Sequence, residues 1–297
     1  MFCACAVAQE SPTIEPLLPE VESATALAIR PSGNRERHEL FVADVEGRVL
    51  RVASEALDKP EVIVAENGYA ATAICFVNGK TFVVATGNAP PQLRAYEIPD
   101  DGKPLTAEQT KFDVRAAAGF DGKATAMTLG PTALYVVGAT DETGWLLRSR
   151  VRSGMPGEMK PFATIGRRPI CVAISTRGWV VVGDAGKSDE SGDSRLTFLH
   201  PSDSTAEPAL AFEPGLLDIA AIAYSPRESL YAADTAEADP ARCGIYRIDM
   251  DYEENRIAGK AVRALSLDSP TAMSFAPDGT LYVIAQNGKL FRAIGIE

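Results

Sequence analysis

A four-strand pattern that recurs six times constrains the fold of this chain more than any other feature. Segments of small and apolar residues open the repeats, at intervals of 47, 53, 45, 50 and 51 residues. They start at Ala24, Ala71, Ala124, Pro169, Ile219 and Pro270. Internal periods of about 40–50 residues are typical of β-propellers, in which each repeat is a blade of four antiparallel strands. We therefore predict an all-β, six-bladed β-propeller.

The strands of a repeat can be followed from turn to turn. The turn residues Asp278-Gly279 follow the last opening segment, and a second apolar strand, Leu281-Tyr-Val-Ile, comes next. This last repeat has only three strands, whereas the extended segment Thr13-Ile-Glu-Pro-Leu-Leu precedes the first inner strand. We predict that this segment completes blade six and closes the ring, because an open sheet edge would otherwise be exposed. The alternative is an unstructured leader.

The first ten residues differ in character from residues 11–297, which we assign to one propeller domain. Residues 1–10 are mostly small and apolar, and Ala6-Val-Ala has the small-x-small form of a signal-peptidase site. We expect this segment to be either the end of a secretory signal or a disordered leader. On the first interpretation the protein is exported, to the periplasm or the cell exterior.

The charge balance argues against several partners. Lys and Arg number 29 against 40 Asp and Glu, which gives a net charge of −11. Nucleic-acid binding depends on neutralising phosphates, so an acidic protein is a poor candidate for it. No apolar run approaches the roughly 18 residues that a membrane span needs. We expect a monomer, in which Cys75, Cys171 and Cys243 are buried small residues.

One segment carries a resemblance to known propellers. Ser269-Pro-Thr-Ala-Met-Ser-Phe-Ala-Pro-Asp-Gly-Thr-Leu-Tyr-Val resembles the repeats of the NHL and the gluconolactonase/senescence-marker-protein propellers. In outline the resemblance covers all six repeats, and it implies the propeller fold. The hydrolases of this group hold a divalent metal with Glu, Asn and Asp side chains at the tops of the inner strands. The resemblance therefore implies that a site would lie at those positions.

The matching positions hold other residue types, namely Thr25, Thr72, Thr125, Ile170, Ala220 and Thr271. Threonine hydroxyls do not supply the negative charge that carboxylates offer to Ca²⁺ or Mg²⁺. The nearest acid, Asp218, stands alone, two residues before Ala220. We predict no catalytic residue, no metal ligand and no cofactor. The four threonines either present hydroxyls to a polar ligand or pack where the blades crowd together.

Strand direction divides the loops between two faces of the ring. The loops from strand four to the next inner strand share one face with the loops between strands two and three. We call this the funnel face, and propeller ligands usually bind there. His38 and His200, the two histidines of the chain, are expected in surface turns on the opposite face. A general base or metal ligand of the histidine type is therefore not expected at the funnel.

Charged residues gather in the funnel-face loops of blades three, four and five. The acids are Asp141, Glu142, Asp184, Asp189, Glu190, Asp193, Asp234, Glu237 and Asp239. Nearer the axis, the cations Lys123, Arg167 and Arg168 lie beside them. An arginine can hold a carboxylate or phosphate with two hydrogen bonds. Our candidate ligand site combines the four threonines with Lys123, Arg167, Arg168, Asp184, Asp218 and Asp234.

Two further interpretations concern the same loops. The Asp189–Asp193 run is not an EF-hand loop, although adventitious Ca²⁺ binding is left open. Cys171 follows a funnel position, and Arg168 could lower its thiol pKa. A thiol nucleophile also needs a base, so we expect Cys171 to be inert.

The sequence thus predicts a non-catalytic exported propeller that binds a protein partner or a small polar ligand on the funnel face. The alternatives are a gluconolactonase-like, metal-dependent hydrolase with a rearranged site, and a module of a larger extracellular enzyme.

Overall fold

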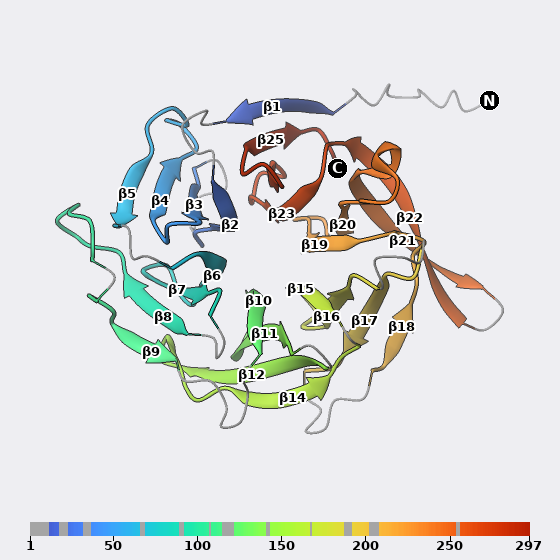
Figure 1. Ribbon diagram of the computed structural model, residues 1–297, viewed down its shortest axis with the longest axis horizontal. Coiled ribbons are helices and arrows are strands. Elements are labelled where there is room, and N and C mark those ends of the chain that lie inside the picture. Colours follow the sequence, from blue (N-terminus) through green and yellow to red (C-terminus); the bar gives the residue numbers. More distant parts are fainter. Residues whose placement is uncertain are drawn as a thin grey trace, which may run out of the picture.

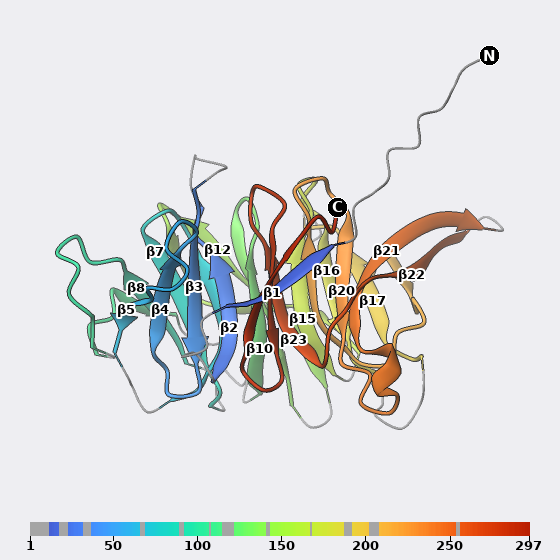
Figure 2. The ribbon, with the colours of Figure 1, turned by 90° about the horizontal axis from the view of Figure 1, so that it is seen from above.

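The chain forms a closed ring of six antiparallel sheets around a central axis (Figure 1), and this confirms the predicted six-bladed β-propeller. The computed structural model describes residues 12–17, 23–31, 37–65, 69–88, 92–106, 108–114, 122–140, 143–166, 168–186, 192–201, 208–253 and 256–297. Seen from the side, the ring is a flat disc whose strands run roughly along its axis (Figure 2). No helix in the described ranges is long and apolar enough to cross a membrane.

Each blade has its first strand at the axis and its fourth strand at the rim. Blade one contains β2 (Ala24–Ile29), β3 (Glu39–Asp44), β4 (Val49–Ala53) and β5 (Glu61–Val64). Blade two contains β6 (Ala71–Phe76), β7 (Thr81–Thr86), β8 (Leu93–Glu97) and β9 (Phe112–Val114). Blade three contains β10 (Lys123–Leu129), β11 (Ala133–Ala139), β12 (Gly144–Arg152) and β14 (Lys160–Thr164), with the short β13 (Met155–Pro156) beside the end of β12.

The remaining three blades repeat this order. Blade four contains β15 (Pro169–Ile174), β16 (Val180–Asp184), β17 (Arg195–Leu199) and β18 (Leu210–Phe212). Blade five contains β19 (Ile219–Tyr224), β20 (Leu230–Asp234), β21 (Gly244–Glu253) and β22 (Arg256–Ser266), with the 3-10 turn η1 (Pro240–Arg242) before β21. Blade six contains β23 (Pro270–Phe275), β24 (Leu281–Ala285), β25 (Leu290–Ile294) and β1 (Thr13–Leu17).

The N-terminal strand β1 closes the ring, as the missing fourth strand predicted. It pairs antiparallel with β25 over its whole length, from Thr13 opposite Ile294 to Leu17 opposite Leu290. Ile14 packs against the core between blades five and six, and Leu17 packs against the core between blades six and one. One short strand therefore joins the two ends of the chain and contacts the apolar layers on both sides of blade six.

The apolar core is divided among the junctions between blades. The six largest clusters of buried residues each combine side chains from two neighbouring blades, and the junction of blades six and one has its own cluster. The second strands, such as β7 and β11, supply many of the buried side chains, because nearly all of their residues are buried. β-branched and aromatic residues suit strands covered on both faces.

His38 is buried, which corrects its prediction as a surface turn residue. Its side chain is only 3% exposed, at the junction of blades one and six. Nε2 lies 2.8 Å from the Tyr282 hydroxyl, and the two rings meet edge to face. Nδ1 lies 3.8 Å from Asp278 Oδ2, which is too long for a hydrogen bond. The turn that carries His38 does lie on the face opposite the funnel, where the His38 side chain packs at the junction of blades one and six.

The first prediction concerns ring closure. The substitution Leu17→Asp places a carboxylate in the apolar layer between blades six and one, and we expect it to cost about 2 kcal/mol or more. For a chain of this size that lowers Tm by roughly 4 °C or more. Thr13→Asp is the matched control, since Thr13 lies exposed on the same strand. Equal Tm values for the two variants in scanning calorimetry would contradict the closing role of β1.

The second prediction concerns pH. Burial lowers the pKa of His38 below its usual 6.5, and nearby Asp278 offsets only part of this effect. The unfolded chain therefore takes up a proton at a higher pH than the folded chain does. Stability from neutral His38 is complete above about pH 6.5 and decreases as pH falls below it. We expect the wild-type Tm to fall more steeply than that of His38→Gln between about pH 7 and pH 5. Parallel Tm curves would show that His38 titrates normally.

Candidate functional site

All six inner strands contain a β-bulge at the same place. The register with the second strand shifts between Ala24 and Ala26 in blade one, and at the corresponding residues of the other five blades. The residues bypassed by these shifts are Thr25, Thr72, Thr125, Ile170, Ala220 and Thr271. The funnel positions predicted from the repeat are thus the bulged residues. A bulge redirects a side chain, leaves the extra residue unpaired and disrupts the ladder locally.

The threonine hydroxyls donate hydrogen bonds to backbone carbonyls at these bulges. Thr25 Oγ1 donates to the carbonyl of Ala43 at 3.2 Å, and Thr271 Oγ1 donates to the carbonyl of Ile284 at 3.2 Å. Thr72 makes the equivalent bond at 3.4 Å, whereas Thr125 lies within reach of two carbonyls, one of them that of Pro169 in blade four. Each hydroxyl proton is directed at the backbone, which favours the packing interpretation of the threonines. Only acceptor lone pairs remain for a ligand.

Asp184 and Asp234, two acids of the predicted site, bind backbone amides. Asp234 is fully buried at the end of β20, and its carboxylate accepts from the N–H groups of Leu217, Asp218 and Ala236 at 2.8–3.1 Å. Asp184 accepts from the N–H groups of Arg168 and Gly186 at 3.1 and 2.9 Å. Through these hydrogen bonds, each carboxylate holds the loop that leads into a blade against the end of the second strand of that blade.

Glycine is required where the loop approaches Asp184. Gly166 has a φ of +44°, and a Cβ there would lie 1.9 Å from Asp184 Oδ2. Asp44 stands at the same place in blade one, at the end of β3, but it accepts from the N–H groups of Glu46 and Arg48 in the turn that follows. Our sequence reasoning missed Asp44. The recurrence of Asp at the end of the second strand in blades one, four and five is the signal that could have revealed it.

Lys123, Arg168 and Asp218 occupy one equivalent position in three consecutive blades. Each lies two residues before the bulged residue of its inner strand, where the other blades have Ser23, Ala70 and Ser269. In the blades of Arg168 and Asp218, the carbonyl of this residue accepts a hydrogen bond from the residue that follows the second strand. Lys123 and Arg168 are exposed, and Asp218 is half-buried. Half of the funnel mouth is therefore charged, and the other half carries small uncharged side chains.

Arg168 and Asp218 influence one another across the junction of blades four and five. Burial raises the pKa of the Asp218 carboxyl, and the charges of Asp234 and Glu237 add to the rise, whereas the backbone N–H of Glu237 and, to the smallest extent, Arg168 oppose it. Asp218 Oδ2 accepts from the N–H of Glu237 at 3.2 Å. Arg168 Nη1 donates to the carbonyl of Gly186 at 3.3 Å, a long bond that leaves its other N–H groups directed elsewhere. Neighbouring blades thus offer the donors of Arg168 and the carboxyl group of Asp218 at equivalent positions.

The structure places only part of the predicted acidic sector. Asp141, Glu142, Arg167, Asp189 and Glu190 lie outside the described residues. Asp193, Glu237 and Asp239 lie in the funnel-face loops, as the repeat predicted. In the described ranges no group of three or more His, Cys, Asp or Glu side chains could hold a metal ion.

The remaining titratable candidates lie either on the opposite face or buried within the blades. His200 is exposed in the turn after β17, where its ring packs edge-on against Trp179. Cys75, Cys171 and Cys243 are buried free thiols, as predicted. Burial raises the pKa of Cys171, a backbone hydrogen bond at Gly183 opposes this rise, and nearby Asp184 adds to it. The thiol is therefore protonated near neutral pH.

The other end of the central channel is apolar. Around it lies a cavity of about 370 Å³, lined by the last residues of all six inner strands. The final residue of each strand is Ile29, Phe76, Leu129, Ile174, Tyr224 or Phe275. Burial raises the pKa of Tyr224 to about 12. Charged groups near the axis are thus concentrated at the funnel end.

Comparison with solved structures shows the fold and leaves the activity unassigned. A Thermus thermophilus protein assigned as a glucose dehydrogenase matches with a TM-score of 0.66 and 16% identity, over 96% of this chain and 100% of that one. The PQQ-bound aldose sugar dehydrogenase of Streptomyces coelicolor matches with a TM-score of 0.65 and 14% identity, over 95% and 98%. A protein assigned as a gluconolactonase matches with a TM-score of 0.65 and 12% identity, over 96% and 92%. No family model and no curated protein sequence matches.

The third prediction tests the buried carboxylates. Asp234→Ala leaves three buried N–H groups without acceptors, so we expect a loss of about 3 kcal/mol or more of unfolding free energy. Asp239→Ala removes an exposed charge from the same loop and should change stability by less than about 0.5 kcal/mol. Chemical denaturation of both variants measures the difference. A mild effect of Asp234→Ala would contradict the role of this carboxylate in holding the entering loop.

Proposed function

We propose that this protein is a non-catalytic exported propeller that binds a small polar anion at the funnel mouth, between Lys123, Arg168 and Asp218. The observation that carries the proposal is the charged half of the mouth, where three consecutive blades place Lys, Arg and Asp at one equivalent position. Two cations and one carboxyl suit a ligand with a carboxylate or phosphate and a neighbouring hydroxyl. Arginine can hold such an anion with two parallel hydrogen bonds.

The surroundings favour binding at this place. Asp184 and Asp234 direct their oxygens at backbone amides, so their charge is largely compensated within the protein. The far end of the channel is lined mostly by apolar side chains, which suit a ligand of another kind. Rigid strands position the three charged residues, an arrangement typical of recognition by loops on a stable scaffold.

A gluconolactonase-like hydrolase is the second candidate, and the comparisons with a gluconolactonase and two sugar dehydrogenases favour it as much as they favour a binding protein. The residues at the inner-strand tops do not fit the divalent metal that such a hydrolase implies. They are four threonines, an isoleucine and an alanine, and the threonine protons are directed at carbonyls. Neither histidine lies at the funnel to serve as a base.

The fourth prediction tests the proposed site with D-gluconate and inorganic phosphate as probes. A ligand at about ten times its Kd stabilises a protein by about 1.4 kcal/mol, or roughly 2–4 °C in Tm. We expect at least one probe to produce this shift in the wild type and none in Arg168→Ala. Arg177→Ala is the control, because Arg177 is exposed in a turn on the opposite face.

A lactone hydrolysis assay on the same samples separates the two candidates. Turnover of gluconolactone that requires added Ca²⁺, Mn²⁺ or Zn²⁺ would support the hydrolase and overturn the proposal. Anion binding without turnover supports the binding propeller.

A further inference from the structure

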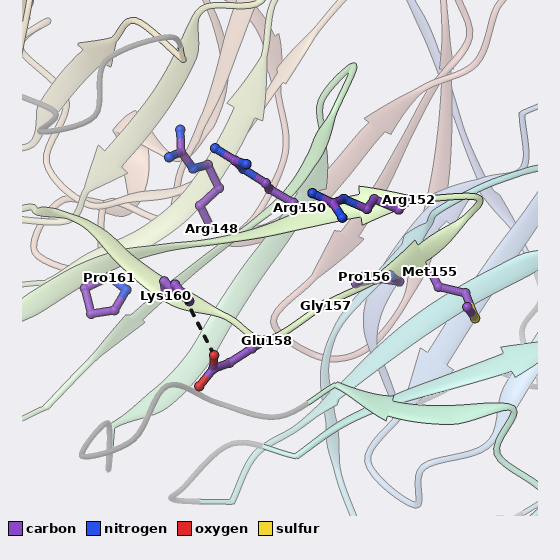
Figure 3. A pocket seen from close by; sticks show the side chains of 9 residues that line it. All are labelled: Arg148, Arg150, Arg152, Met155, Pro156, Gly157, Glu158, Lys160 and Pro161. Carbon is purple, nitrogen blue, oxygen red and sulfur yellow. Dashed lines mark ion pairs between the residues drawn. The ribbon is translucent and has the colours of Figure 1, made fainter.

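The third strand of blade three carries a row of arginines along one face. β12 extends over nine residues, and alternate side chains on it are Arg148, Arg150 and Arg152. Alternate residues of a strand point to the same side and are spaced by roughly 6.6–6.8 Å. Figure 3 shows the three side chains succeeding one another along β12. Third strands run from the funnel face of the ring to the opposite face. The Arg152 end of this row therefore lies on the face of the ring opposite the funnel.

Sheet register adds two more side chains to the same face. Arg148 is paired with Lys160 of β14, and Arg152 is paired with Met155 of β13. Together they border an open groove of about 710 Å³, whose lining also includes Pro156, Gly157 and Pro161. Glu158 is the single acid of this lining, and it pairs with Lys160 at 3.9 Å. The groove is thus strongly cationic and has an exposed methionine at one end.

The inner end of the row is held in place by the neighbouring structure. The Arg148 guanidinium lies 4.3 Å from the centre of the Phe162 ring and donates to the carbonyl of Pro201 in blade four at 3.1 Å. Arg150 and Arg152 are exposed, and within the described ranges no ion pair involves either of them. Two arginines without acidic partners are notable in a chain of net charge −11, since nearby acids could have neutralised them at little cost.

The spacing between the arginines of the row matches the spacing of side chains in an extended partner chain. In an extended peptide, side chains at alternate positions also recur every 6.6–6.8 Å or so. Carboxylates at three alternate positions would therefore each face one arginine. A polynucleotide carries charge at every residue and would be repelled by the acidic remainder of the surface. A short acidic peptide carries only a few negative charges, and all of them would lie beside the row of arginines.

We propose that the arginine face of β12 binds an extended acidic segment of a partner protein, with carboxylates at alternate positions and an apolar residue beside Met155. This surface is separate from the funnel mouth, so it could act whether or not an anion is bound there. The proposal does not depend on the function assigned to the funnel.

The fifth prediction uses two fluorescein-labelled peptides of identical composition. One contains Glu-Ala-Glu-Ala-Glu followed by Leu, and the other contains Glu-Glu-Glu-Ala-Ala followed by Leu. In fluorescence anisotropy at about 50 mM salt, where screening is limited, we expect the alternating peptide to bind at least about 5-fold more tightly. The double variant Arg150→Ser/Arg152→Ser should weaken its binding by about 10-fold or more.

The control variant is Arg177→Ser/Arg227→Ser, which removes two exposed arginines from turns on the face of the ring opposite the funnel. It changes the net charge equally and should leave the Kd within about 2-fold. A Tm measurement on both double variants verifies that they fold. Equal Kd values for the two peptides, no binding up to about 1 mM, or equal losses in the two double variants would each overturn the proposal. Tighter Arg150-dependent binding of an oligothymidylate with the same charge would do so as well.

Discussion

Each blade of this propeller has two apolar faces, and neither can be buried within the blade itself. The only cover is a neighbouring blade on each side, so burial is complete only when the ring closes. The core clusters show this directly, because each of the six largest joins two blades. The pairing of β1 with β25 completes blade six, and Ile14 and Leu17 of this strand pack against the junctions on its two sides. A five-residue strand from the start of the chain thus joins the last blade to the rest of the ring.

Closure of the ring also determines which groups remain for function. Six inner strands converge at the axis, where small residues and bulges allow them to fit together. The threonines at the bulges satisfy strand carbonyls, and buried aspartates hold the entering loops by their amides. Polar groups that resemble a ligand site in the sequence are thus largely used by the fold. Lys123, Arg168 and Asp218 lie just before the bulges, where the side chains of Arg168 and Asp218 each make one long hydrogen bond to the backbone.

The repeat made the architecture predictable because period, turn residues and β-branched strands all indicate the same unit. It also predicted the closing strand, since a missing fourth strand and a spare segment are both visible in the chain. The roles of Asp184 and Asp234 could not be predicted in this way, because a carboxylate that binds amides has the same place in the repeat as one that binds a ligand. His38 was misplaced for a related reason. Its turn position is visible in the sequence, whereas its contact with Tyr282, 244 residues away, is not.

The central claim is that ligand binding at the funnel depends on Arg168 and its neighbours, with the threonine ring serving the fold. A crystal structure of the protein soaked in D-gluconate and CaCl₂ tests it most directly. We expect a gluconate carboxylate within about 3 Å of the Arg168 guanidinium, beside Asp218, and no ion at the axis. Calcium coordinated by the hydroxyls of Thr25, Thr72, Thr125 and Thr271 would contradict the account.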